Sequence, residues 1–206
     1  MAKKLKIRID LKILFFLIIF YFTKQIRIYL IVMFFAFLHE IGHIIVGIIL
    51  KMKLEKIEIM PFGLSAAFYT NFDDKHFKFK EIFVALAGPV TSLFLVILCN
   101  NLNFTYITKQ EAVYSNLLIL FFNLIPLYPL DGGRIIKGII YTKLGIIQTE
   151  NIVNKISNIT MIVLTIISSI TVYYYKNIAI FLICIFLWSI VLQEKNDKTL
   201  AILQGK

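Results

Sequence analysis

Two histidines and a glutamate inside an apolar stretch have the types and spacing needed for metal-dependent hydrolysis. The sequence His39-Glu40-Ile41-Gly42-His43 places the histidines four residues apart, so on a helix both imidazoles lie on one face and can bind one metal ion. The carboxylate of Glu40 lies beside them, where it can take a proton from a metal-activated water. The motif therefore predicts a metal site with Glu40 as the general base.

The residues around this motif distinguish it from a chance match. Apolar side chains fill positions 34–38 before the motif and positions 44–46 after it. Placing two imidazoles and a carboxylate in an otherwise apolar membrane helix costs on the order of several kcal/mol, and such groups usually mark a functional site. We therefore interpret the pattern as a metal site.

A third metal ligand is predicted at Asp131. A catalytic zinc normally takes three protein ligands and keeps a fourth position for water. Asp131 follows an apolar span, in a segment (123–133) that two prolines and two glycines break. It could instead cap the helix that follows, but two histidines at the same expected depth favour ligation. His76 lies among charged residues and is interpreted as a loop residue, so one Zn²⁺ bound by His39, His43 and Asp131 is predicted.

The composition of the chain excludes a soluble globular domain. Of its 206 residues, 59% are hydrophobic and 17% are charged, and the mean hydropathy is +0.83. A soluble domain has a larger charged fraction, because it must cover its core with polar surface. The net charge of +10 first suggests nucleic acid, but no long basic run is present and the charges fall between apolar stretches. This arrangement indicates an integral membrane protein.

The chain is predicted to be a single all-α polytopic membrane domain over residues 1–206. Apolar stretches give about six membrane spans, several of them near the ~20 residues that cross a bilayer. A short β-strand or hairpin at the membrane surface is predicted near 55–68, where apolar and charged residues alternate before Pro61 and Gly63. The predicted spans are 13–22, 28–50, 82–98, 114–130, 156–175 and 178–192.

The distribution of basic residues predicts how these spans are oriented. With the N-terminus in the cytoplasm, 18 of the 22 Lys and Arg residues fall in cytoplasmic segments, as the positive-inside rule requires. Both termini are therefore expected in the cytoplasm, and the predicted site opens toward the same side. The positive charge is assigned to anionic lipid and not to nucleic acid.

Several motifs together resemble the site-2 protease family of intramembrane zinc metalloproteases. The resemblance rests on the His39–His43 motif and on Asn123-Leu-Ile-Pro-Leu-Tyr-Pro-Leu-Asp-Gly-Gly133, with further matches at Pro61-Phe62-Gly63 and Ala87-Gly88-Pro89. The size and the expected topology look most like the sporulation branch, the stage IV sporulation protein FB type. One departure is Ser92, where the family commonly has Asn; a hydroxyl can still form a hydrogen bond there.

The resemblance implies a function for the predicted site. It implies that zinc is held by the two histidines and Asp131, that Glu40 is the base, and that Asn123 and Pro126 help position the substrate. It also implies that the strand 61–68, which contains Gly63, pairs with an extended peptide. The implied partners are a membrane-tethered substrate, a pro-sigma factor during sporulation, and regulatory membrane proteins.

Two other functions compete with proteolysis. A metal-ion transporter also contains intramembrane His, Glu and Asp, but it needs polar ligands along a path across the bilayer. Here the polar groups are confined to one expected depth. A non-catalytic scaffold of the same family would retain the fold without activity, yet all four catalytic positions are intact. The sequence therefore favours an enzyme.

Overall fold

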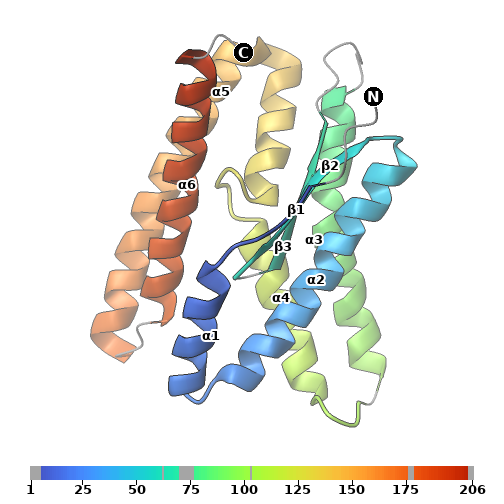
Figure 1. The fold of residues 1–206 in the computed structure, drawn as a ribbon, viewed down its shortest axis with the longest axis vertical. Helices are drawn as coiled ribbons and strands as arrows, with labels where there is room; N and C mark the ends of the chain where they lie inside the picture. The colour runs from blue at the N-terminus through green and yellow to red at the C-terminus, as the bar shows by residue number, and fades with distance from the viewer. Residues whose placement is uncertain (1–5, 62, 70–76, 103, 176–178, 204–206) are drawn as a thin grey trace. The chain divides into compact units, whose positions relative to one another are not determined.

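The structure is a computed structural model that describes residues 6–61, 63–69, 77–102, 104–175 and 179–203. Its contacts divide the chain into two compact units, Met1–Leu124 and Ile125–Lys206, and each unit is described by itself. Figure 1 shows the order of helices and strands within each unit. That the whole chain forms a single domain stays a prediction.

The first unit is built around the helix that carries the histidine motif. This helix, α2, packs against α3 and α4, and buried residues such as Ile31 and Phe35 form part of their shared core. At a rise of 1.5 Å per residue the 24 residues of α2 extend about 36 Å, which is enough to cross a bilayer. The helices of this unit are α1 (Lys12–Phe22), α2 (Ile26–Ile49), α3 (Phe77–Asn101) and α4 (Lys109–Asn123).

A three-stranded sheet completes the first unit. Strands β2 (Leu54–Met60) and β3 (Gly63–Phe68) pair antiparallel, with Met60 opposite Gly63, which confirms the predicted hairpin. Gly63 has a φ of 138°, which a side chain rarely tolerates. Strand β1 (Lys6–Ile9) pairs parallel to β2, so the order is β1-β2-β3. The strand β1 was not predicted, although its alternation of basic and apolar residues is the pattern of a strand.

The hairpin runs back along α2 and does not lie beyond its C-terminal end. At one end of β3 the ring of Phe68 packs so closely on Gly47 that a Cβ there would overlap it. At the other end the hydroxyl of Tyr29 donates a hydrogen bond to the carbonyl oxygen of Pro61 at 2.7 Å. Residues 29 and 47 are about 27 Å apart along the helix, so the strand follows most of its length.

The second unit is a set of helices with one sharp interruption. Helix α5 (Asp131–Tyr175) is broken at Gly145, where φ is 76°, and Lys137 and Glu150 form an ion pair at 2.6 Å between the two helical segments. Helix α6 (Ala179–Leu203) packs against α5, with Trp188 Nε1 donating to Thr165 Oγ1 at 3.1 Å. The predicted span 156–175 lies within α5, and α6 contains residues 179–192 of the predicted span 178–192. The expected turn between the two spans falls at residues outside the described ones.

The fourth predicted span ends well before its expected last residue. The fourth was expected over 114–130, but α4 ends at Asn123, because Pro126 and Pro129 have no backbone N–H for a helical hydrogen bond. Among the described residues, three helices are long and apolar enough to cross a membrane: Ile26–Ile49, Phe79–Asn101 and Gln148–Tyr174. The number of six spans is therefore not confirmed.

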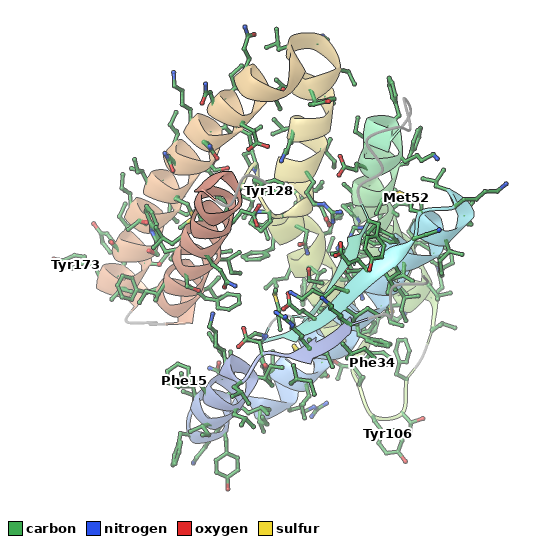
Figure 2. The ribbon with its side chains drawn as sticks, turned by 45° about the horizontal axis from the view of Figure 1, so that its top comes forward. Phe15, Phe34, Met52, Tyr106, Tyr128 and Tyr173 are labelled. Atoms are coloured by element: carbon green, nitrogen blue, oxygen red, sulfur yellow. The ribbon has the colours of Figure 1, made fainter. Side chains whose placement is uncertain are left out.

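Many large apolar side chains face outward in both units. Phe15 and Phe34 of the first unit are 59% and 53% exposed, and Tyr173 of the second is 79% exposed. Figure 2 shows these rings projecting from their helices. A soluble protein rarely exposes so many large apolar side chains, whereas a lipid bilayer would cover them.

Candidate metal centre

The two histidines of α2 converge inside the first unit. His39 and His43 are 3% and 1% exposed, and their Nε2 atoms lie 3.2 Å apart. A tetrahedral zinc ion with Zn–N bonds of about 2.0–2.1 Å holds its ligand nitrogens about 3.3 Å from one another. The pair therefore has the spacing of two ligands of one ion, as its position four residues apart on a helix predicts.

Hydrogen bonds from α3 fix the orientation of both imidazoles. His43 Nδ1 lies 2.6 Å from the carbonyl oxygen of Val84, which only accepts, so Nδ1 carries a proton and, in the neutral imidazole, Nε2 does not. His39 Nδ1 lies 2.8 Å from the hydroxyl of Ser92, which is fully buried. When Nδ1 of His39 donates to that hydroxyl, its Nε2 is also unprotonated and can bind a metal.

A glycine on α3 leaves room for the two Nε2 atoms. A Cβ placed on Gly88 would overlap Nε2 of both His39 and His43. The sequence marked Ala87-Gly88-Pro89 only as a family match, and the structure supplies the physical reason for the glycine. Since this space lies directly beside the converging nitrogens, any larger residue would push the imidazoles away from a shared ion.

Glu40 lies beside the histidines and is anchored by the sheet. Its Oε1 accepts a hydrogen bond from the backbone N–H of Ala66 in β3 at 2.6 Å. Its Oε2 lies 3.9 Å from His43 Nε2, and the residue is 8% exposed. The carboxylate is therefore within reach of a water bound beside the imidazoles, which is the position that a general base requires.

Asp131 is the first residue of α5 in the second unit. The structure confirms that segment 123–133 is not a continuous helix. Asp131 lies in the first turn of α5 itself, where a carboxylate is favoured by the helix dipole, and its Oδ1 is 3.8 Å from Arg134 Nη1. A Cβ on Gly133 would overlap the backbone of Leu127 and Tyr128, so this glycine allows the loop to fold against the helix.

Two hydroxyl groups of α5 hold the loop that precedes Asp131. Ser157 Oγ accepts a hydrogen bond from the backbone N–H of Tyr128 at 3.1 Å. Thr160 Oγ1 donates one to the carbonyl oxygen of Pro126 at 3.1 Å. Sequence reasoning missed both residues, although two hydroxyls three positions apart in an apolar helix are a detectable signal.

The remaining predicted residues have simpler surroundings. Asn123 is the last residue of α4, and its Nδ2 donates to the carbonyl oxygen of Ile119 at 3.0 Å. Gly63 begins β3 in the first unit, and Pro126 lies in the loop of the second. His76 lies outside the described residues. Within the first unit, the structure brings His39, Glu40 and His43 together.

Comparisons with known proteins relate the chain to metallopeptidases. The profile of the family described as Peptidase M50B-like matches residues 12–130, more than half of the chain, and that of Peptidase family M50 matches residues 105–167. A zinc metalloprotease of Methanocaldococcus jannaschii is 28% identical over 166 residues, covering 77% of this chain and 46% of that protein. Stage IV sporulation protein FB of Bacillus subtilis is 26% identical over 118 residues, covering 55% of this chain and 40% of that protein.

A solved structure shares the fold. The site-2 protease of Methanocaldococcus jannaschii superposes with a TM-score of 0.74 at 23% identity, covering 94% of this chain and 92% of that one. The chain spans less than half the length of the two curated relatives above.

Proposed function

Since the chain belongs to the M50B-like peptidase family, that of the site-2 proteases, we propose that it is an intramembrane zinc metalloendopeptidase. Its substrate is a membrane-tethered protein that it cleaves within or near the bilayer. The observation that carries this proposal is the convergence of His39 and His43, 3.2 Å apart at Nε2, beside the carboxylate of Glu40. These groups lie in a helix of an integral membrane protein, where burying polar side chains costs free energy and such side chains usually mark a functional site.

The proposed ligands are His39, His43 and Asp131. Two neutral imidazoles and one carboxylate form a donor set that suits Zn²⁺ and leaves a fourth position for water. A zinc ion in that position would lower the pKa of its bound water to about 7 and polarise a peptide carbonyl. The hydrogen bonds to Val84 and Ser92 support the ligand role of the histidines, because an imidazole that donates from Nδ1 leaves Nε2 available to bind a metal.

The protein's own groups perform the proton transfers. Glu40 accepts the proton of the attacking water and then donates it to the leaving amine of the cleaved peptide. The substrate is held extended, because a helical peptide hides its carbonyl groups in intrahelical hydrogen bonds. We assign this role to the strand that begins at Gly63, while Asn123 and Pro126 contribute to positioning at the end of α4.

We further propose a cytoplasmic site and a role in sporulation. The excess of basic residues in segments expected on the inner side supports cytoplasmic termini and a site that opens toward the cytoplasm. Similarity to stage IV sporulation protein FB supports a pro-sigma factor as substrate and regulatory membrane proteins as partners. The net charge of +10 supports contact with anionic lipid.

The proposal is tested with purified full-length protein in liposomes together with a membrane-tethered pro-sigma substrate. Glu40→Gln retains the shape of the side chain but removes the base, so cleavage should fall about 10²–10⁴-fold while bound zinc stays at wild-type level. Zinc content measured by mass spectrometry provides the control. Cleavage by folded, zinc-loaded Glu40→Gln at the wild-type rate would falsify the mechanism.

The same preparation distinguishes the competing functions. Zinc uptake into liposomes without cleavage of any tethered substrate would identify a transporter. Folded protein that neither cleaves nor transports would identify a scaffold. A protease cleaves the tethered substrate and does not move zinc across the bilayer.

A further inference from the structure

We propose that the backbone N–H of Ala66 positions Glu40 for catalysis. Of the backbone amides of β3 that point away from β2, one then binds Glu40 and its neighbours remain available to bind the substrate. The inference rests on the proposed function. Ala66 acts as a positioning residue for the base, whereas the neighbouring outward amides of Leu64 and Phe68 pair with the peptide. The substrate this edge selects is an extended segment that pairs on both sides of Ala66.

The contact between Glu40 and Ala66 has the geometry of an anchored base. One carboxylate oxygen accepts the amide of Ala66 at 2.6 Å, and the other lies 3.9 Å from His43 Nε2. Such a charge-assisted hydrogen bond is short and directional, so it fixes the rotation of the carboxylate. Oε2 is consequently turned toward the imidazoles.

Three further contacts keep the Ala66 amide in this place. The ring of Phe68 fills the space above Gly47, and a Cβ on Gly63 would contact Ala36 at 3.1 Å. The turn is held by the hydrogen bond from Tyr29 to Pro61. These contacts occur at successive levels of α2, so β3 cannot slide by one residue without losing all of them.

The pairing of β3 determines which of its amides face outward. Successive amides of a strand point to opposite edges, and Ile57 of β2 lies opposite Ala66. Because the N–H of Ala66 points away from β2 to Glu40, those of Leu64 and Phe68 also point outward, and those of Ser65 and Ala67 point toward β2. In the described sheet β3 is an edge strand, so an added strand would pair there.

The inference is tested by removing one outward amide at a time with proline. Ala66→Pro removes the donor to Glu40, and Leu64→Pro is the matched control on the same edge of the same strand. Neither change removes a hydrogen bond between β3 and β2. We expect Ala66→Pro to lower kcat about 10–100-fold with KM nearly unchanged, because misplacing a catalytic group has effects of this size. We expect Leu64→Pro to raise KM with kcat nearly unchanged.

A double mutant separates positioning from general damage. In the Glu40→Gln background, Ala66→Pro should cause no further loss of the residual rate, because the group it positions is gone. An equal loss in both backgrounds, or an Ala66→Pro effect confined to KM, would overturn the inference. If the proline variant does not fold, replacing the amide at position 66 by an ester removes the N–H alone.

A spectroscopic measurement does not depend on activity. With ¹³C-labelled glutamate, the infrared carboxylate band assigned to Glu40 by its absence in Glu40→Gln should shift in Ala66→Pro and not in Leu64→Pro. If the band shifts but no variant, including wild type, cleaves a substrate, the proposed function fails and the contact stands. If cleavage occurs and the band does not shift, the positioning role fails and the protease stands.

Discussion

The two regions that supply the proposed zinc ligands are built on opposite principles. His39 and His43 belong to one regular helix, whose period places them on one face, and each imidazole forms a hydrogen bond with a group of α3. Asp131 follows an irregular loop, in which the amide of Tyr128 donates to Ser157 and the carbonyl oxygen of Pro126 accepts from Thr160, both of α5. A helix satisfies its own backbone, whereas a broken segment needs outside partners.

Each region also packs closely against a glycine, and the two glycines leave space for different groups. Gly88 leaves space for the Nε2 atoms of two side chains, and Gly133 leaves space for the backbone of Leu127 and Tyr128. A side chain that is pushed aside can change its rotamer. In a new rotamer, however, these imidazoles could no longer act as the proposed zinc ligands. A displaced backbone carries the residues that follow it, here the segment leading to Asp131.

The largest effect is expected from Gly88→Ala. Its methyl group would overlap Nε2 of His39 and His43, so the two nitrogens could no longer share an ion. Zinc affinity, measured by competition with a chelator, should fall at least about 100-fold, at the upper end of what changes around metal ligands cause. Gly47→Ala is the matched control, because its methyl group would also overlap a closely packed side chain, here the ring of Phe68. It should leave zinc affinity nearly unchanged.

A smaller loss is expected from Gly133→Ala. The new methyl group would displace the backbone of Leu127 and Tyr128, and hence the loop before Asp131. Zinc affinity should fall about 10–100-fold, while the histidine pair of the first unit is undisturbed. Gly145→Ala provides a contrast, since no atom lies within 4 Å of its Cβ and only the φ of 76° is strained. A Gly133→Ala protein with wild-type zinc affinity would contradict the role of the loop.

Removing one hydroxyl in each region compares them directly. Ser92→Ala leaves Nδ1 of His39 without the Ser92 hydroxyl, and zinc affinity should fall about 10-fold or more. Ser157→Ala removes the hydrogen bond between Ser157 and the amide of Tyr128, at a cost of about 0.5–1.5 kcal/mol in stability, and acts on zinc only through the loop. Ser92→Asn should retain zinc binding better than Ser92→Ala.

The spectrum of the cobalt-substituted protein distinguishes the two hydroxyls. Ser92→Ala should change the visible bands of bound Co²⁺ more than Ser157→Ala, because Ser92 contacts His39, a proposed ligand, whereas Ser157 contacts the loop before Asp131. Ser169→Ala serves as the control for loss of a hydroxyl on α5, because the hydroxyl of Ser169 donates to the carbonyl oxygen of Thr165 in the same helix. Equal changes for all three variants would remove the distinction drawn here.

The same contrast explains what the sequence could predict. The convergence of His39 and His43 follows from the helical period, and the break before Asp131 follows from two prolines, so both were predictable. The partners of the histidines, Val84 and Ser92, lie 41 and 53 residues away along the chain. Only the packing of α3 on α2 brings them close, and no local pattern encodes that packing.

In the sheet too, features that depend on neighbouring residues were predictable, and features that depend on distant segments were not. The hairpin near 55–68 was predicted from alternation and from Pro61 and Gly63, which act over a few residues. The parallel pairing of β1 with β2 and the course of β3 along α2 were not predicted, because both depend on contacts between distant segments. The amide of Ala66 was missed as a partner of Glu40 for this reason.

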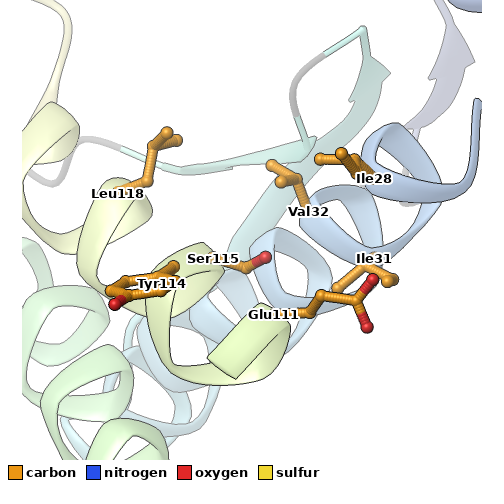
Figure 3. A pocket seen from close by; sticks show the side chains of 7 residues that line it. All are labelled: Ile28, Ile31, Val32, Glu111, Tyr114, Ser115 and Leu118. Carbon is orange, nitrogen blue, oxygen red and sulfur yellow. The ribbon is translucent and has the colours of Figure 1, made fainter. Parts of the chain in front are cut away.

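A third region supplies the smallest expected effect, because its polar groups are more exposed than those around the histidines. At the start of α4, Glu111 forms a capping box with Thr108 and an ion pair with Arg27 of α2 at 3.0 Å. Figure 3 shows Glu111 at the edge of an apolar pocket between these helices, beside Tyr114. The hydrogen bonds from the backbone and hydroxyl of Thr108, and then the charge of Arg27, hold the pKa of Glu111 below its ordinary value of 4.5.

This carboxylate predicts a weak dependence of stability on pH. Because the pKa of Glu111 is lower in the folded protein, its stabilisation is present above pH 4.5 and is lost as the pH falls through the lower folded value. At pH 7, Glu111→Gln should lower Tm by only about 1–2 °C, since exposed ion pairs contribute little, and it should leave zinc affinity unchanged. The difference in Tm between the two proteins should shrink below pH 4 and in high salt. A difference that does not shrink as the pH falls below 4.5 would show that Glu111 acts through packing and not through its charge, and the contrast with the buried groups around the histidines would not hold.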